Sequence, residues 1–248
     1  MYFDTHAHYD DREQLLASMP ENGVTLIVNA GSNMESSRMA LKLAAKFPFV
    51  YAAAGVHPHD AKEMDDNTIL ELEKLFADPK AVAVGEIGLD YHYDFSPRDV
   101  QQKRFREQME LARSLKLPAV IHEREAAGDV LSIVREFSDV RGVYHCYSGS
   151  WETAKIVLNQ GWYLSFTGVI TFKNARRVAE VIQQMPEDRI MIETDCPYLA
   201  PEPNRGKRNS SLNLVHIAQR IAEIRGITLQ EAAQITMENG KRFFGIDA

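Results

Sequence analysis

The chain opens with the stretch Met1-Tyr2-Phe3-Asp4-Thr5-His6-Ala7-His8, an apolar run that ends in two histidines one residue apart. On an extended strand alternate side chains point to one face, so Asp4, His6 and His8 would share a face. On a helix, at roughly 100° per residue, His6 and His8 would lie about 200° apart and could not share an ion. We therefore expect a strand that presents two imidazoles at its C-terminal end. Whether they bind a metal depends on whether other strands deliver ligands to the same place.

The composition fits one α/β protein of moderate size. The 248 residues are 45% hydrophobic and 25% charged, which is ordinary for a globular protein. The sequence shows neither the roughly 20-residue apolar run of a membrane helix nor a leader pattern, so we expect a cytoplasmic protein with no membrane attachment. The net charge of −7 argues against coating nucleic acid by bulk charge. It does not exclude a nuclease, because bound divalent cations can invert the local field.

Strand-like and helix-like segments alternate from end to end. Eight apolar or β-branched runs are expected as strands, at residues 1–6, 24–30, 50–56, 81–84, 118–121, 142–144, 163–166 and 190–192. Alternation of this kind implies a parallel sheet. Eight units in about 250 residues fit an α/β single (β/α)₈ TIM barrel, one domain over residues 1–248. A doubly wound open sheet is the alternative.

Several helix starts carry capping signals. Ser32 with Glu35 and Thr228 with Glu231 have the spacing of a capping box, in which two side chains satisfy backbone N–H groups reciprocally. Ser150 can cap a helix that begins at the next residue. The longest expected helix covers residues 99–116, with a charged face and an apolar face.

Metal-binding residue types gather at the C-terminal ends of five of the expected strands. In a barrel these ends form one rim, and barrel enzymes build their active sites there. Strand alternation gives these side chains one common parity; Glu86, for example, shares the face of Val82 and Val84. The six candidate ligands are His6, His8, Glu86, His122, His145 and Asp195.

Six ligands exceed the three protein ligands that a single catalytic zinc usually has. We therefore expect two divalent ions, with both histidines of the first strand and Asp195 around one of them. His122 and His145 would surround the other, and Glu86 would bridge the two. Such a pair of ions polarises a phosphoryl oxygen and activates water. The mixed nitrogen and oxygen donors suit Zn²⁺ or Mn²⁺, and availability could favour Mg²⁺.

The motifs at these strand ends resemble those of the TatD family of metal-dependent deoxyribonucleases, within the amidohydrolase-like barrels. They occur in family order across almost the whole chain. The segments that carry the resemblance are Asp4-Thr5-His6-Ala7-His8, Gly55-Val56-His57-Pro58, Gly85-Glu86-Ile87-Gly88-Leu89-Asp90-Tyr91, His122 with Arg124, His145-Cys146-Tyr147-Ser148-Gly149, Glu193-Thr194-Asp195-Cys196-Pro197-Tyr198-Leu199 and Arg205-Gly206-Lys207-Arg208-Asn209. One departure is visible: the family commonly continues with Glu-Pro where this chain has Ser210-Ser211.

The resemblance implies a divalent-metal-dependent hydrolase of phosphodiester bonds in DNA, often a 3′–5′ exonuclease on single strands. It implies metal roles for the same six residues. It adds a catalytic role for Asp195 as general base toward the attacking water, and it places His57 near the substrate phosphate. Glu86 would hold the ions together.

Basic residues near the rim are candidates for substrate binding. Arg124 lies two residues past His122, and its planar guanidinium suits a phosphate; the alternative is a salt bridge to a neighbouring surface carboxylate. Arg205 and Lys207 belong to a basic cluster that follows the last strand of an acidic protein, where it could attract a polyanion such as DNA.

Other residues near the rim are expected in supporting roles. Asp90 and Glu193 are candidates to orient ligand histidines through their second ring nitrogens. His59, in contrast, is expected on the surface without a functional role.

Two further functional classes stay open. An amidohydrolase or phosphotriesterase-like enzyme could act on a small amide, lactone or ester at a similar metal pair, since one fold hosts several chemistries. A barrel could also serve as a scaffold without catalysis. The sequence leaves open the metal used, DNA against RNA, endo- against exonuclease action, and the oligomeric state.

Overall fold

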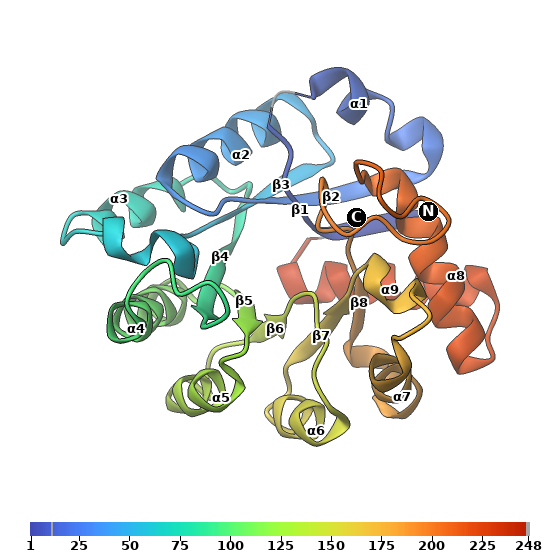
Figure 1. Ribbon diagram of the computed structural model, residues 1–248. Helices are drawn as coiled ribbons and strands as arrows, with labels where there is room; N and C mark the ends of the chain where they lie inside the picture. The colour runs from blue at the N-terminus through green and yellow to red at the C-terminus, as the bar shows by residue number, and fades with distance from the viewer. Residues whose placement is uncertain (11, 247–248) are drawn as a thin grey trace. The chain divides into compact units, whose positions relative to one another are not determined.

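The computed structural model describes residues 1–10 and 12–246 (Figure 1). Strands and helices alternate along them. The strands are β1 (Tyr2–Ala7), β2 (Val24–Ala30), β3 (Val50–Ala54), β4 (Ala81–Asp90), β5 (Ala119–Arg124), β6 (Gly142–Tyr144), β7 (Tyr163–Phe166) and β8 (Ile190–Ile192). The α-helices are α1 (Glu13–Ala17), α2 (Met34–Lys46), α3 (Thr68–Leu75), α4 (Arg98–Leu115), α5 (Ala127–Glu136), α6 (Trp151–Asn159), α7 (Arg176–Gln184), α8 (Leu214–Arg225) and α9 (Leu229–Phe244). Short 3₁₀ turns include η2 (Pro58–Glu63) and η3 (Gly168–Thr171).

The strands follow one another in the sheet in the order of the chain, from β1 to β8. Neighbouring strands run parallel in the pairs β3–β4, β4–β5, β5–β6 and β7–β8. A doubly wound sheet would instead reverse its strand order at a switch point. The sequential order and the alternation with helices confirm the expected (β/α)₈ barrel class and exclude the open-sheet alternative.

The chain divides into two compact units. The central unit comprises residues 29–144 and the terminal unit comprises residues 1–28 and 145–248. In the central unit α2 packs on β3 and α4 packs on β4, whereas in the terminal unit α9 packs on β1 and β8. The expectation of a single domain over residues 1–248 stays a prediction. Asp11 and residues 247–248, which this expectation includes, lie outside the described residues.

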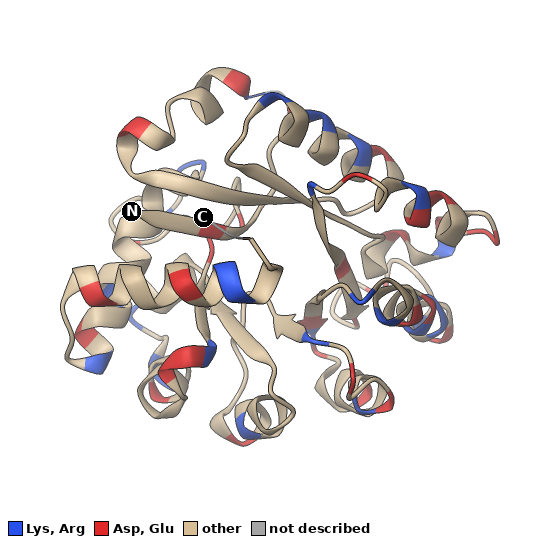
Figure 2. Cartoon of the chain, turned by 180° about the vertical axis from the view of Figure 1, so that it is seen from behind, with Lys and Arg blue, Asp and Glu red and all other residues tan. Residues whose placement is uncertain are grey.

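Each unit has its own apolar core. Ile87 and Phe105 are fully buried in the central unit, and Phe3, Trp162 and Phe243 in the terminal unit. Fully burying such a side chain contributes about 1.5–3 kcal/mol. Charged residues lie mostly on helices and their connections, while the strands carry few (Figure 2). No helix within residues 1–10 and 12–246 combines the length and apolar character that crossing a bilayer requires.

Two of the three expected caps are confirmed. Thr228 and Glu231 form the capping box of α9, and the Ser150 hydroxyl accepts from Thr153 N–H at the start of α6. The expected Ser32 cap is wrong. Asn33 caps α2, because its extended backbone lets its side chain accept from Ser36 N–H while Ser36 Oγ accepts from Asn33 N–H.

Strands β4 and β5 are longer than expected. β4 continues to Asp90 instead of ending at Val84, because its later residues pair with β5 out to Asp90 opposite Arg124. The register shifts between Val84 and Ile87. This irregularity interrupts simple alternation just where Glu86 stands, so the face of Glu86 does not follow from counting along the strand. β3 is shorter than expected and ends at Ala54.

Candidate metal centre

In the terminal unit the ligands expected from the first and last strands converge. The Nε2 atoms of His6 and His8 lie 3.0 Å apart. Oδ1 of Asp195 lies 3.7 Å from Nε2 of His6 and 3.3 Å from Nε2 of His8. The ring of His145 stacks on the ring of His6 with centroids 4.2 Å apart. Three donor atoms therefore face one another within a space that a divalent cation could occupy.

The backbone after β8 is tied to β1, which places Asp195 beside these histidines. The N–H of Asp195 donates to the carbonyl of His6 at 3.0 Å. One residue earlier, Thr194 N–H donates to the carboxylate of Asp4 at 2.8 Å. Asp4 is completely buried, and that burial raises its pKa to about 7 despite the hydrogen bonds from Ser211 and Thr194. Asp4 thus fixes the connection that carries Asp195.

The charge state of Asp195 is set by two opposing effects. Burial alone would raise the pKa of its carboxyl, but the hydrogen bond from His8 and the nearby imidazoles outweigh burial and lower the pKa. The structure therefore favours the carboxylate form, which is the form that binds a metal.

Glu193 lies beside His145 at the same end of the terminal unit. Its Oε1 lies 3.3 Å from Nδ1 of His145 and accepts from the N–H of Cys146. This is the contact expected of a carboxylate that orients a ligand histidine. Donor atoms of His6, His145 and Glu193 also lie within 4.8 Å of one another. Glu193, expected only to orient a ligand histidine, is therefore a candidate ligand as well.

In the central unit His57, Glu86 and His122 form a second cluster. Oε1 of Glu86 lies 2.8 Å from Nδ1 of His122 and 3.5 Å from Nε2 of His57. The rings of His57 and His122 are in edge contact, with centroids 4.3 Å apart. One donor atom from each of the three residues lies within 4.8 Å of the others. His57, expected near the substrate phosphate, thus belongs to a possible ligand group itself.

Two more residues support this central cluster. Oδ2 of Asp90 lies 3.2 Å from Nε2 of His122 and 2.9 Å from Nε2 of His59. The expectation that His59 is an uninvolved surface residue is wrong: it is half-buried, and its ring lies 4.2 Å from that of His57. Burial alone would raise the pKa of Asp90, but hydrogen bonds from His122, Tyr93 N–H and His59 hold it well below its usual range.

The residues present fit divalent metal ions. Each cluster offers imidazole nitrogens and carboxylate oxygens, the donor set that suits Zn²⁺ and Mn²⁺. The donor atoms of the two triplets His6–His145–Glu193 and His57–Glu86–His122 are each grouped within 4.8 Å, although the residues come from separate strand ends. Such convergence of ionisable side chains is costly unless they are paired or bind a cation.

Arg124 is exposed at the end of β5, and its guanidinium lies 4.8 Å above the ring of Tyr93. Within the described residues it forms no ion pair. The nearby carboxylates have other partners, since Glu125 contacts His92 at 2.7 Å and Glu123 accepts from Ala126 N–H. The Arg124 guanidinium is thus available to a ligand.

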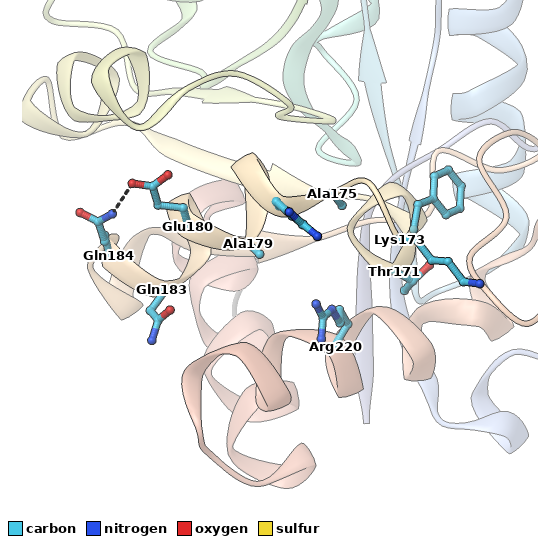
Figure 3. Close-up of a pocket in the computed structure, with 10 residues that line it drawn as sticks. Thr171, Lys173, Ala175, Ala179, Glu180, Gln183, Gln184 and Arg220 are labelled. Carbon is cyan, nitrogen blue, oxygen red and sulfur yellow. Dashed lines mark hydrogen bonds between the residues drawn. The ribbon is translucent and has the colours of Figure 1, made fainter.

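Arg205 and Lys207 are exposed on the connection after β8. The Arg205 guanidinium lies 4.2 Å from the centre of the Phe172 ring and 3.9 Å from Glu202. Phe172 lines a surface pocket of about 450 Å³ at α7 and α8, with Arg220 on α8 opposite Ala179 on α7 (Figure 3). None of the six expected metal ligands lines this pocket.

The fold and its convergent histidines and carboxylates are those of a metal-dependent hydrolase built on a (β/α)₈ barrel. The model of the TatD-related DNase family matches residues 3–245, and the chain belongs to this family. The metal-dependent hydrolase YabD of Bacillus subtilis is 43% identical over the whole of both chains. The 3′-5′ ssDNA/RNA exonuclease TatD of Citrobacter rodentium is 34% identical, with 95% of this chain and 92% of that protein covered. The TatD homologue YJJV of Escherichia coli superposes with a TM-score of 0.92 at 28% identity, covering 99% and 98% of the two chains.

Proposed function

We propose that this hydrolase is a divalent-metal-dependent deoxyribonuclease that removes nucleotides from the 3′ end of single-stranded DNA. The observation that carries the proposal is the pair of histidine and carboxylate clusters at strand ends, which offers the ligands of a phosphodiesterase metal centre. The name of the Citrobacter rodentium relative supports the direction of cutting and a nucleic acid substrate.

We assign one ion to each cluster. His6, His8, His145 and Asp195 would hold the first, and His57, Glu86 and His122 the second. This differs from the sequence-based grouping, because His145 lies against His6 and His57 lies against Glu86. The bridging role of Glu86 stays a prediction. Bound ions would polarise the phosphoryl oxygen and lower the pKa of bound water.

The protein's own residues would then act on the substrate. The Asp195 carboxylate is the general base that accepts the proton of the attacking water. His57 lies beside Glu86 in the central cluster, and this cluster would face the scissile phosphate. Arg124 from the central unit, and Arg205 and Lys207 from the terminal unit, would bind phosphates of the strand by charge-assisted hydrogen bonds.

Metal-dependent digestion of end-labelled substrates tests the proposal. Protein stripped with chelator is reloaded with Mg²⁺, Mn²⁺ or Zn²⁺ and given single-stranded DNA, double-stranded DNA or RNA, labelled at either end. We expect a 5′-labelled single strand to shorten as a ladder, and a 3′-labelled strand to release its label in the first step. The Asp195→Asn protein serves as the inactive control.

The alternative chemistry predicts a different outcome. Metal-loaded protein that leaves every polynucleotide intact but hydrolyses a small lactone, ester or amide would contradict the nuclease assignment and support the amidohydrolase-like reading. Internal cuts from the first time point, with no ladder from the 3′ end, would contradict the exonuclease mode alone.

A further inference from the structure

Two large aromatic side chains stand exposed on the connection between β4 and α4. Tyr93 is 47% and Phe95 56% exposed. Their rings are stacked on each other, with centroids 5.2 Å apart and planes 22° from parallel. We call this pair the aromatic platform. An exposed apolar patch of this kind is unfavourable in water and commonly marks a binding site.

The backbone under the platform is well anchored, so the exposure of the rings is not a consequence of a loose loop. Oδ1 of Asp90 accepts from the N–H of Tyr93 at 2.9 Å. Buried Ser96 donates to the carbonyl of His59 at 2.8 Å, and Gln101 donates to the carbonyl of Ser96 at 2.8 Å. These bonds hold the two aromatic residues in place without burying them.

The platform adjoins the central cluster through His59. The ring centroid of His59 lies 5.4 Å from that of Tyr93 and 4.8 Å from that of Phe95. Nε2 of His59 is hydrogen-bonded to Asp90, and Asp90 is also hydrogen-bonded to the candidate ligand His122. A ligand that stacked on the rings would therefore extend directly toward the proposed metal site of the central unit.

The charged side chains beside the platform favour binding of a negatively charged group. The Arg124 guanidinium lies over the Tyr93 ring, and within the described part of the chain it has no carboxylate partner. Asp94, between the two aromatic residues, is neutralised by a two-point contact with Arg98. A flat, π-faced group attached to a phosphate matches both features, because bases stack on aromatic rings and guanidinium groups bind phosphates.

We propose that the aromatic platform, with Arg124, binds a nucleobase and its phosphate in a polynucleotide whose next phosphate is presented to the central cluster. The inference rests on the proposed nuclease function and names the residues that hold the strand. Stacking accepts every base, so the platform gives affinity for unpaired nucleotides without a sequence preference. The platform also favours single strands, because their bases are unpaired and free to stack on the rings.

Binding of a nuclease-resistant probe tests the platform separately from cleavage. Fluorescein-labelled phosphorothioate oligothymidylate, and the same backbone with abasic residues in place of all thymidines, are titrated with metal-loaded protein and followed by anisotropy. The variants are the double substitution Tyr93→Ala/Phe95→Ala and the conservative pair Tyr93→Phe/Phe95→Tyr. Leu70→Ala is the matched control, since Leu70 is an equally exposed apolar residue of the central unit at 55%.

We expect the double alanine variant to weaken binding of the thymidine probe by roughly 5- to 100-fold, the range for losing one base–aromatic stack. Binding of the abasic probe should be unaffected by the substitutions. The conservative pair and Leu70→Ala should retain wild-type binding. Thermal unfolding and metal content of each variant establish that the fold and the clusters are intact.

Equal loss for the thymidine and abasic probes would overturn the proposal, because the rings would then act on the backbone or the fold. Unchanged binding of the thymidine probe would overturn it as well. If the wild type were a dimer and the double alanine variant a monomer, and the substitution affected both probes equally, the proposal would also be overturned. The rings would then be assigned to contact between two copies of the chain. Failure of the nuclease function is seen separately, as wild-type protein that cleaves no polynucleotide in the digestion described above.

Discussion

Nδ1 of His122 lies 2.8 Å from Oε1 of Glu86, although 36 positions separate the two residues in the chain. The other nitrogen of the same ring lies 3.2 Å from Asp90. The imidazole is therefore held at both nitrogens between two carboxylates. Ligand histidines commonly have this arrangement, in which one nitrogen faces the metal group and an outer carboxylate fixes the ring.

Replacing Glu86 by Ala should abolish activity while leaving the fold intact. The substitution removes the carboxylate that lies against both His57 and His122, so the central cluster loses the anion of its ligand set. We expect turnover to fall at least about 100-fold and one divalent ion to be lost, measured by cleavage rate and by metal analysis after desalting. Near-normal turnover at low metal would contradict both the ligand and the bridging role.

Asp90→Asn should weaken metal binding without removing a ligand. Asp90 contacts the ring nitrogen of His122 that faces away from Glu86, so it acts as a positioning residue. We expect about 10- to 100-fold lower metal affinity, and excess metal should restore most of the rate. Metal titrations of activity measure both.

The matched control for that substitution is Asp94→Asn. Asp94 is exposed four residues further on and pairs only with Arg98 among the described residues. Its substitution should leave metal affinity unchanged. If Asp90→Asn lowered the rate at every metal concentration, Asp90 would act in the reaction itself and not through His122.

The sequence was sufficient for the fold because its signals are local and repeated. Strands β6, β7 and β8 begin and end where their short apolar runs do. β4 was predicted too short because Glu86, Asp90 and two glycines between residues 85 and 90 are typical of a turn. Pairing with β5, which is not visible in a single segment, stabilises those residues as strand instead.

The site was predicted less evenly. The alternation expected for an extended segment places His6 and His8 together correctly: β1 ends at Ala7, and the Nε2 atoms of the two histidines lie 3.0 Å apart. His59 was missed, since its position depends on the turn that begins at Pro58 and on a hydrogen bond to Asp90. The expected grouping of His145 with His122 around one ion rests only on the order of the strands that carry them. Only side-chain geometry shows His145 stacked on His6.

Thr228→Ala should lower the stability of the terminal unit by about 1 kcal/mol. The Thr228 hydroxyl accepts from Glu231 N–H at the start of α9, which packs on β1 and β8. Its removal leaves an N–H of the first turn without its cap. Urea unfolding followed by circular dichroism measures the loss.

Gln234→Ala, on the exposed face of the same helix, is the control and should change stability by less than about 0.5 kcal/mol. Equal effects of the two substitutions would contradict the capping role.

Gly88→Ala should damage stability and metal binding together. Gly88 has φ +147°, and a Cβ there would lie 2.0 Å from the carbonyl oxygen of His122, its pairing partner on β5. The strained backbone alone costs about 1–3 kcal/mol, and relief of the contact must move the strand that carries His122. We expect a lower unfolding temperature and weaker metal binding, measured by calorimetry with and without metal.

Gly128→Ala separates that effect from the general cost of changing a glycine. Gly128 lies in the first turn of α5 with nothing within 4 Å of an added Cβ, so alanine there should be neutral or stabilising by up to about 1 kcal/mol. Gly88→Ala protein that unfolded like the wild type and bound metal equally well would mean that β4 and β5 can separate without disturbing His122. Loss of metal affinity with little loss of stability would instead show that the close approach at Gly88 serves mainly to place the His122 ring.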